Sequence, residues 1–233
     1  MATRPAYLPL QSGPSLVRTE IVAFEWSPGL ALSQKQKSIA SLHRSAETLL
    51  AVPRILEISS KSTDPAGRAL SAFNMTLPIS ALSRGVSVEC AFQGSKVFER
   101  GGPYTDLYGG SSRDAKTDPR LRASGRLIAF DFEDDRWPVE PQTAFYDWLY
   151  ARALLTNPQL AACIGEYDAF TDIEFNPEKS INCQAYSAAL FSALASRNLL
   201  TQATASKQSF LEMANQIPSP RPAKRDQGQA SLF

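Results

Sequence analysis

The sequence has 233 residues, 43% hydrophobic and 20% charged, which is the composition of an ordinary globular protein and predicts one main domain. Its 24 basic and 23 acidic residues argue against a large nonspecific nucleic-acid surface, although a small local one is compatible with them. Three cysteines and a single histidine, His43, are too few for a zinc or iron–sulfur site, so neither a metal nor another cofactor is expected. No apolar run is long enough to span a membrane, so a cytosolic protein without a membrane partner is expected.

The beginning of the chain predicts a strand followed by a helix. Residues 17–26 alternate between two faces and end at a Ser-Pro-Gly turn, as a strand would. Residues 34–50 place apolar side chains at steps of three and four, which is the spacing of one helix face. We therefore interpret residues 1–53 as a folded N-terminal extension that packs on the core.

The middle of the chain predicts two strands separated by loops. Residues 54–59 (RILEIS) predict a second short strand, and the Asp-Pro and Gly residues of segment 61–67 predict a turn-rich loop after it. Residues 100–120 hold two Gly-Gly pairs and two prolines, which predict a long loop of a functional or mobile kind. Residues 126–132 alternate again and predict another strand.

Two helices and a tail complete the prediction. Residues 143–155 and 180–197 are rich in good helix formers and are expected to be core helices, the second capped by Ser180 or Asn182. Residues 214–233 contain prolines and almost no apolar periodicity, which predicts a disordered tail. Residues 54–213 would then be the catalytic domain.

The segment 88–99 (VECAFQGSKVFE) mixes charges into an apolar pattern. Glu89, Phe92, Gln93 and Lys96 are spaced so that one side of a helix would hold all four. A desolvated lysine near a carboxylate can lose its proton near neutral pH and become a nucleophile. The plainer interpretation is a half-buried Glu–Lys pair on an amphipathic helix, and spacing alone favours it.

A second polar segment, residues 167–184, precedes the last predicted core helix. Its acidic residues Asp168, Asp172 and Glu174 lie in a loop that leads to a helix N-terminus, a combination that often holds a ribose or a phosphate. The alternative is an acidic turn followed by an ordinary helix cap. The acidic residues lack the dense alternation of a calcium-binding loop.

Taken together, these segments resemble the motifs of the NADAR family, in the family's order, across roughly residues 54–198. The most specific match is residues 88–96 (VECAFQGSK), which resemble the family's "vEhyFQaqK" helix. Ala72 stands where the family usually has asparagine, and Cys90 stands where a histidine is common. The resemblance implies a single α+β domain, mainly helical with a small sheet.

The family resemblance also implies a reaction, the cleavage of an N-glycosidic bond to a ribose through a lysine Schiff base. Lys96 is carried into the role of that lysine, with Glu89 first and Asp172 second as acid or base. Asp172 would otherwise hold ribose hydroxyls. Substrate-binding residues expected from the resemblance and from the Gly-rich segment are Ser59, Lys61, Ser71, Phe73, Phe92, Gln93, Gly101, Gly102, Tyr104, Trp137 and Asn182. For the aromatic residues, core packing is the alternative.

Within the family, the N-terminal extension and several runs, such as SGRLIAFDF, resemble the branch found beside DarT-type toxins. That resemblance implies a substrate, ADP-ribosylated guanine in DNA, a product, ADP-ribose, and a DarT-type toxin as functional partner. Two other functions stay open. One is an N-glycosidase for a ribosylamino intermediate of the riboflavin pathway, and the other is a non-catalytic antitoxin that binds its toxin directly.

Overall fold

The computed structural model describes residues 1–80 and 82–217, and they form the single α+β domain that the sequence predicts. Its largest sheet has the strand order β2-β1-β9-β3. The antiparallel hairpin of β1 (Ala2–Pro9) and β2 (Val17–Phe24) joins β9 (Ala169–Thr171), and β3 (Ile55–Glu57) pairs with β9 in parallel. The predicted N-terminal extension therefore contributes an interior strand, β1, to the sheet shared with β3.

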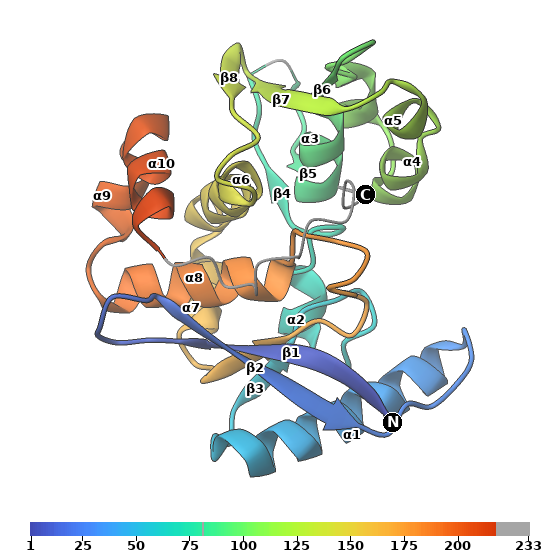
Figure 1. Ribbon diagram of the computed structural model, residues 1–233, viewed down its shortest axis with the longest axis vertical. Coiled ribbons are helices and arrows are strands. Elements are labelled where there is room, and N and C mark those ends of the chain that lie inside the picture. The colour runs from blue at the N-terminus through green and yellow to red at the C-terminus, as the bar shows by residue number, and fades with distance from the viewer. Residues whose placement is uncertain (81, 218–233) are drawn as a thin grey trace.

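Two helices cover the two faces of this sheet (Figure 1). Helix α1 (Leu32–Leu50) lies on one face and buries Ile39, Leu42 and Ala46 there, which confirms three residues of the predicted helical stripe. Leu49, the fourth residue of that stripe, is exposed. Helix α8 (Gln184–Ser196) lies on the other face against β1 and β9. The sheet is thus enclosed on both sides, and apolar burial of this kind is the main source of its stability.

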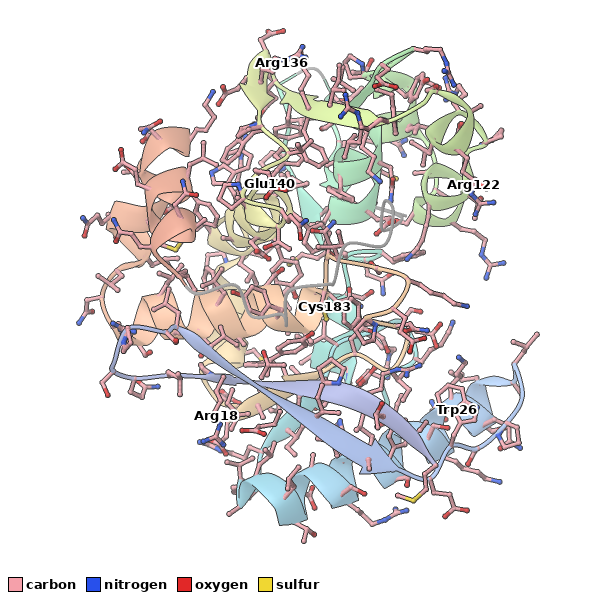
Figure 2. All side chains as sticks on the ribbon, viewed as in Figure 1. Arg18, Trp26, Arg122, Arg136, Glu140 and Cys183 are labelled. Carbon is pink, nitrogen blue, oxygen red and sulfur yellow. The ribbon has the colours of Figure 1, made fainter. Side chains whose placement is uncertain are left out.

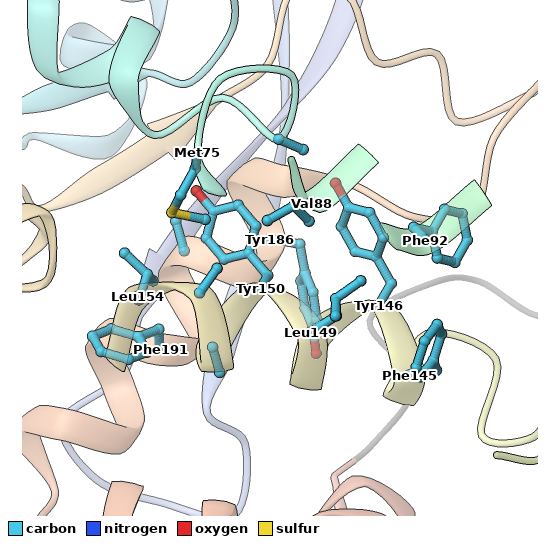
Figure 3. Packing of buried hydrophobic residues seen from close by; sticks show 14 of the residues in the cluster. Met75, Val88, Phe92, Phe145, Tyr146, Leu149, Tyr150, Leu154, Tyr186 and Phe191 are labelled. Carbon is cyan, nitrogen blue, oxygen red and sulfur yellow. The ribbon is translucent and has the colours of Figure 1, made fainter. Parts of the chain in front are cut away.

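Helices α6 (Ala144–Leu155) and α8 are core helices, as predicted. In α6, Tyr146 lies beside Phe92, and the buried Tyr150 hydroxyl donates a hydrogen bond to the Leu70 carbonyl at 2.8 Å (Figure 3). The predicted cap of α8 is wrong. The helix begins after Cys183, an interior residue in Figure 2, and neither Ser180 nor Asn182 caps it.

The second half of the domain is built on a three-stranded antiparallel sheet, β6 (Lys96–Phe98), β7 (Leu127–Phe132) and β8 (Asp135–Trp137). Helix α3 (Val88–Gly94) precedes β6, and the short strands β4 (Thr76–Leu77) and β5 (Val86–Ser87) lead into it. The predicted strand at residues 126–132 is confirmed as β7. Phenylalanine and tryptophan rings from β7, β8 and α6 pack together beneath this sheet.

The prediction of a long loop at residues 100–120 is wrong. The structure has a 3-10 helix, η1 (Thr105–Gly109), and two short helices, α4 (Ser112–Thr117) and α5 (Arg120–Ala123). Ser111 starts α4 by accepting the N–H of Asp114. Elements of one or two turns are too short for apolar periodicity to reveal them.

Short helices also occupy other segments predicted as turns. Helix α2 (Pro65–Ala69) begins inside the predicted loop 61–67, because Asp64 caps its first turn and proline is tolerated at the first helical position.

Helices α7 (Pro158–Ile164), α9 (Leu200–Thr204) and α10 (Lys207–Gln216) complete the described chain. Helix α10 thus extends into the predicted tail, of which residues 218–233 lie outside the described residues.

Neither a membrane span nor a metal cluster is found in the described part of the chain. Across residues 1–80 and 82–217, no helix has both the length and the apolar content that crossing a bilayer requires. Within the same residues, no three His, Cys, Asp or Glu side chains are grouped so that they could hold a metal ion.

Candidate active site

Helix α3 presents the first polar group of the candidate site. Ser87 caps the helix by accepting the N–H of Cys90 at 3.1 Å, and Glu89 lies in the first turn, where the helix dipole favours a negative charge. One turn later, Gln93 donates from Nε2 to Glu89 Oε1 at 2.9 Å. Because a carboxylate can only accept, this contact sets the orientation of the Gln93 amide. The Gln93 carbonyl oxygen, Oε1, is buried without a partner among the described residues.

Lys96 lies on strand β6 and not on the helix predicted for it, because α3 ends at Gly94. A side chain at Gly94 would clash with Tyr108, so the backbone packs closely there before it turns into the strand. Lys96 pairs with Phe130 of β7 and is only 1% exposed. Its Nζ lies 4.7 Å from the centre of the Phe92 ring.

The environment of Lys96 favours the uncharged amine. Burial lowers the pKa of Lys96 to about 7, since an ammonium group loses hydration there, and the charge of Glu89 opposes this shift only in part. The positive charge of Lys116 acts in the same direction as burial. At neutral pH a substantial fraction of Lys96 is therefore neutral, as a nucleophilic amine must be.

Asp172 follows strand β9 and is held by a network centred on Gln184, the first residue of α8. Gln184 donates from Nε2 to Asp172 Oδ2 at 3.0 Å and to the Ile58 carbonyl at 2.7 Å, and its Oε1 accepts the N–H of Ala72 at 2.8 Å. One side chain thus joins the segments after β3, α2 and β9. Burial and the nearby charge of Glu57 raise the pKa of Asp172 to about 7.

These groups surround a cavity of about 500 Å³. Nine of the predicted residues line it, and Lys96 adjoins it through Phe92. The nine are Ser59, Lys61, Ser71, Phe73, Glu89, Phe92, Gln93, Asp172 and Asn182. The segments that resemble one family in sequence therefore meet in space.

Besides Lys96, four predicted residues lie outside the cavity lining, namely Gly101, Gly102, Tyr104 and Trp137. Gly102 has a φ of +84°, and a side chain there would lie 2.1 Å from the Lys96 carbonyl oxygen, so this glycine lets the chain pack against Lys96. Gly101 packs against Tyr104, whose hydroxyl is hydrogen-bonded to Ser124. Trp137 is fully buried between other aromatic rings, where it packs in the core.

The cavity also has a basic side that sequence reasoning missed. Arg113 and Lys116 come from α4, and Lys179 comes from the segment between β9 and α8. The Lys116 ammonium lies 5.1 Å from the centre of the Phe73 ring. Arg113 and Lys116 fall in the segment misinterpreted as a loop, where their common helix face was not recognised. Glu174, a member of the predicted acidic segment, also lines the cavity. Lining residues outside the predicted set are Ser60, Thr117, Tyr146, Phe175, Asn176, Ser180 and Gln184.

In the described part of the chain, Asp168 and Glu174 of the acidic segment 167–184 form ion pairs with basic residues, unlike the buried Asp172 between them. Asp168 forms a largely exposed ion pair with Arg54 at 2.7 Å, so it serves the surface and not the cavity. Glu174 lines the cavity and pairs with Lys35 of α1 at 2.9 Å. The N-terminal helix therefore reaches the edge of the candidate site.

The fold and the cavity define a single-domain α+β protein with a pocket lined by charged, polar and aromatic side chains. The family model of the DarT1-associated NADAR antitoxin matches residues 2–224. The chain belongs to this family, which implies an association with a DarT1 toxin and a glycohydrolase type of activity on ADP-ribose. A search of curated proteins finds no match to the chain.

Proposed function

We propose that the protein is an N-glycosidase that removes ADP-ribose from guanine bases in DNA and thereby acts as an antitoxin. The observation that carries this proposal is the buried amine of Lys96, which lies against the Phe92 ring at a cavity that is also lined by the carboxyl groups of Glu89, Asp172 and Glu174. Membership of the DarT1-associated NADAR antitoxin family supports the part of the proposal that concerns an antitoxin acting on ADP-ribose. The guanine base and the DNA are parts of the proposal that rest on the branch resemblance.

The proposed reaction uses Lys96 as nucleophile and one cavity carboxyl group as proton shuttle. The lone pair of the neutral amine forms a bond to C1 of the ribose. The bond from C1 to the guanine nitrogen breaks, its electron pair stays on that nitrogen, and the carboxyl group protonates it. The lysine nitrogen returns a proton to the carboxylate, which passes it to the ring oxygen as the sugar ring opens to a Schiff base. Water then adds to C1, and loss of the amine releases ADP-ribose.

The basic side of the cavity supports a diphosphate ligand. Arg113, Lys116 and Lys179 are cations that suit phosphate oxygens, and Lys116 lies over Phe73, where a base could stack. A volume of about 500 Å³ lies within the usual range for a ligand of nucleotide size. In this arrangement the diphosphate binds the basic residues, and the carboxyl groups of Glu89 and Asp172 contact the ribose and the glycosidic bond that is cleaved.

Reversing one of these charges should weaken the binding of ADP-ribose. We expect Lys116→Glu to raise the Kd of the product at least about tenfold, since a charge-assisted hydrogen bond contributes about 1.5–3 kcal/mol. Isothermal titration calorimetry measures this directly. Lys37→Glu, an equal charge change at an exposed position of α1, is the matched control and should leave the Kd unchanged. Equal Kd values for the Lys116 variant and the parent would remove Lys116 from the diphosphate site.

The activity is tested with a single-stranded oligonucleotide that carries one ADP-ribosylated guanine. Mass spectrometry should detect free ADP-ribose and an oligonucleotide restored to its unmodified mass. A ribosylamino intermediate of riboflavin synthesis serves as the competing substrate. Turnover of that compound alone would overturn the proposal in favour of a metabolic glycosidase. Protection of cells from the toxin without any release of ADP-ribose would overturn it in favour of an antitoxin that acts by binding.

A further inference from the structure

Glu57 is a buried carboxyl group that the proposed reaction does not use. It ends strand β3, is 2% exposed, and forms no ion pair with any lysine or arginine in the described residues. Its Oε1 accepts the N–H of Ile173 at 2.8 Å, and its Oε2 accepts the hydroxyl of Thr171 at 2.7 Å. Burying a carboxylate costs free energy, and here no cation in the described part of the chain offsets that cost. The burial of Glu57 therefore calls for another explanation.

His43 of helix α1 completes a hydrogen-bond chain to Glu57. Its Nε2 lies 2.9 Å from Thr171 Oγ1. The one hydroxyl proton of Thr171 is donated to Glu57, so the contact to His43 requires that Nε2 carries a proton and donates it. Burial lowers the pKa of His43 to about 4, so the imidazole is a neutral donor at pH 7. Burial raises the pKa of Glu57 above its usual value, and the hydrogen-bond donors from Ile173 and Thr171 oppose this shift by favouring the charged form.

Asp172 is the titratable group that this charge affects. Its Oδ1 accepts the N–H groups of Glu174 and Phe175 at 3.0 and 3.2 Å, which orients the carboxyl group at the cavity wall. Two buried carboxyl groups with like charge resist being ionised together, so the pair retains a proton near neutral pH. The other titratable or charged groups that act on this pair or feel its charge are Lys116 of α4, Tyr146 and Tyr150 of α6, Cys183 before α8, and Glu174.

We propose that Glu57 is a positioning residue that keeps one proton on Asp172, and that Asp172 gives this proton to the departing base. This inference rests on the proposed N-glycosidase function and assigns its proton shuttle. The bond from C1 to nitrogen breaks, the electron pair goes to the guanine nitrogen, and the proton of the Asp172 carboxyl group joins it. The Asp172 carboxylate then takes the proton that the lysine nitrogen loses. Glu89, which accepts from Gln93 and lies near Lys96, keeps a separate electrostatic role.

The test is the pH profile of kcat/KM for the release of ADP-ribose from the modified oligonucleotide. The parent should gain activity as the pH rises and Lys96 loses its proton, and should lose activity at higher pH as Asp172 loses its proton, so the maximum lies near pH 7. In Glu57→Gln the neighbouring charge is gone and Asp172 releases its proton more readily. The alkaline limb should therefore move to lower pH by about one unit. The isosteric glutamine still accepts from Ile173.

Two further variants make the outcome decisive. Thr171→Val removes a donor that stabilises charged Glu57, so it should shift the alkaline limb in the same direction by a smaller amount. Glu99→Gln, a change at an exposed carboxylate paired with Arg126, is the control and should leave the profile in place. A lower rate with an unmoved alkaline limb in both Glu57→Gln and Thr171→Val would mean that Glu57 is merely structural and would overturn the inference.

A titration of the side-chain carboxyl carbons by NMR separates this inference from the proposed function. In the parent, the Asp172 signal should titrate well above the usual range of an aspartate, and Glu57→Gln should lower its midpoint. If the parent releases no ADP-ribose but these shifts occur, the N-glycosidase function fails while the coupling of the two carboxyl groups stands. If the parent turns over and the Asp172 midpoint is unaffected by Glu57→Gln, only the inference fails.

Discussion

Replacing Lys96 with alanine is expected to reduce the release of ADP-ribose by about a thousandfold or more, because loss of the nucleophile leaves no amine to form the covalent intermediate. Lys96→Arg should be as inactive, since a guanidinium group stays charged at any working pH. Single-turnover assays give the rate. Reduction with borohydride during turnover should trap an adduct on the parent protein and none on either variant.

Because Lys96 is buried, loss of activity has to be separated from loss of folding. Lys96→Met keeps the length and the apolar part of the side chain and should retain a cooperative thermal transition without activity. Lys207→Ala removes a lysine that is paired with Asp135 far along the chain, and it should keep full activity. Peptide mapping of the trapped protein is the decisive step. An adduct on Lys61, Lys116 or Lys179 instead of Lys96 would assign the chemistry to another amine.

Trp137→Ala is expected to have the largest effect on stability, a decrease of about 3–5 kcal/mol in the free energy of unfolding. The indole is fully buried, 4.6 Å from the Trp148 ring and 5.6 Å from the Phe145 ring, measured between ring centres. Its removal leaves a void that these two rings cannot fill without leaving their preferred geometry. Urea denaturation followed by circular dichroism measures the change.

A second substitution at this position, Trp137→Phe, distinguishes the two roles considered for this tryptophan, core packing and stacking on the substrate. If Trp137 is only a core residue, Trp137→Phe should keep kcat and KM close to the parent values and lose less stability than the alanine variant, since the phenyl ring fills much of the site. The phenylalanine also removes a buried N–H group that has no partner among the described residues. A large rise in KM with little loss of stability would instead support stacking on the substrate.

The sequence was sufficient to predict much of the candidate site because its residues come from short, locally ordered segments. Glu89, Phe92 and Gln93 lie on one helix turn, and local spacing predicts their common face correctly. Lys96 was predicted on that helix, but the chain changes to a strand after Gly94. The close approach of Tyr108 to Gly94 is a tertiary contact, and no local pattern contains it. The amine nevertheless reaches the Phe92 ring from the strand.

Long-range contacts account for what the sequence did not reveal. Gln184 joins three segments of the chain through one amide, and only the fold brings its partners together. The same holds for His43 and Glu57, which meet through Thr171. One signal was present, namely a glutamate between the apolar residues Leu56 and Ile58 of the predicted strand, because a charge in such a place is rarely buried without a role. The short helices of segment 100–120 left no comparable signal.

The strand order of the large sheet has a consequence for biosynthesis. Strand β1 hydrogen-bonds with β9, and β3 also needs β9 as its neighbour, so both strands are synthesised long before the strand that completes their sheet. Until then the β1–β2 hairpin has an open edge, which invites pairing with other chains. A message that is cut or stalled before the codon for Thr171 would yield no protective protein, only an aggregation-prone fragment. The supply of this antitoxin should therefore depend steeply on complete translation.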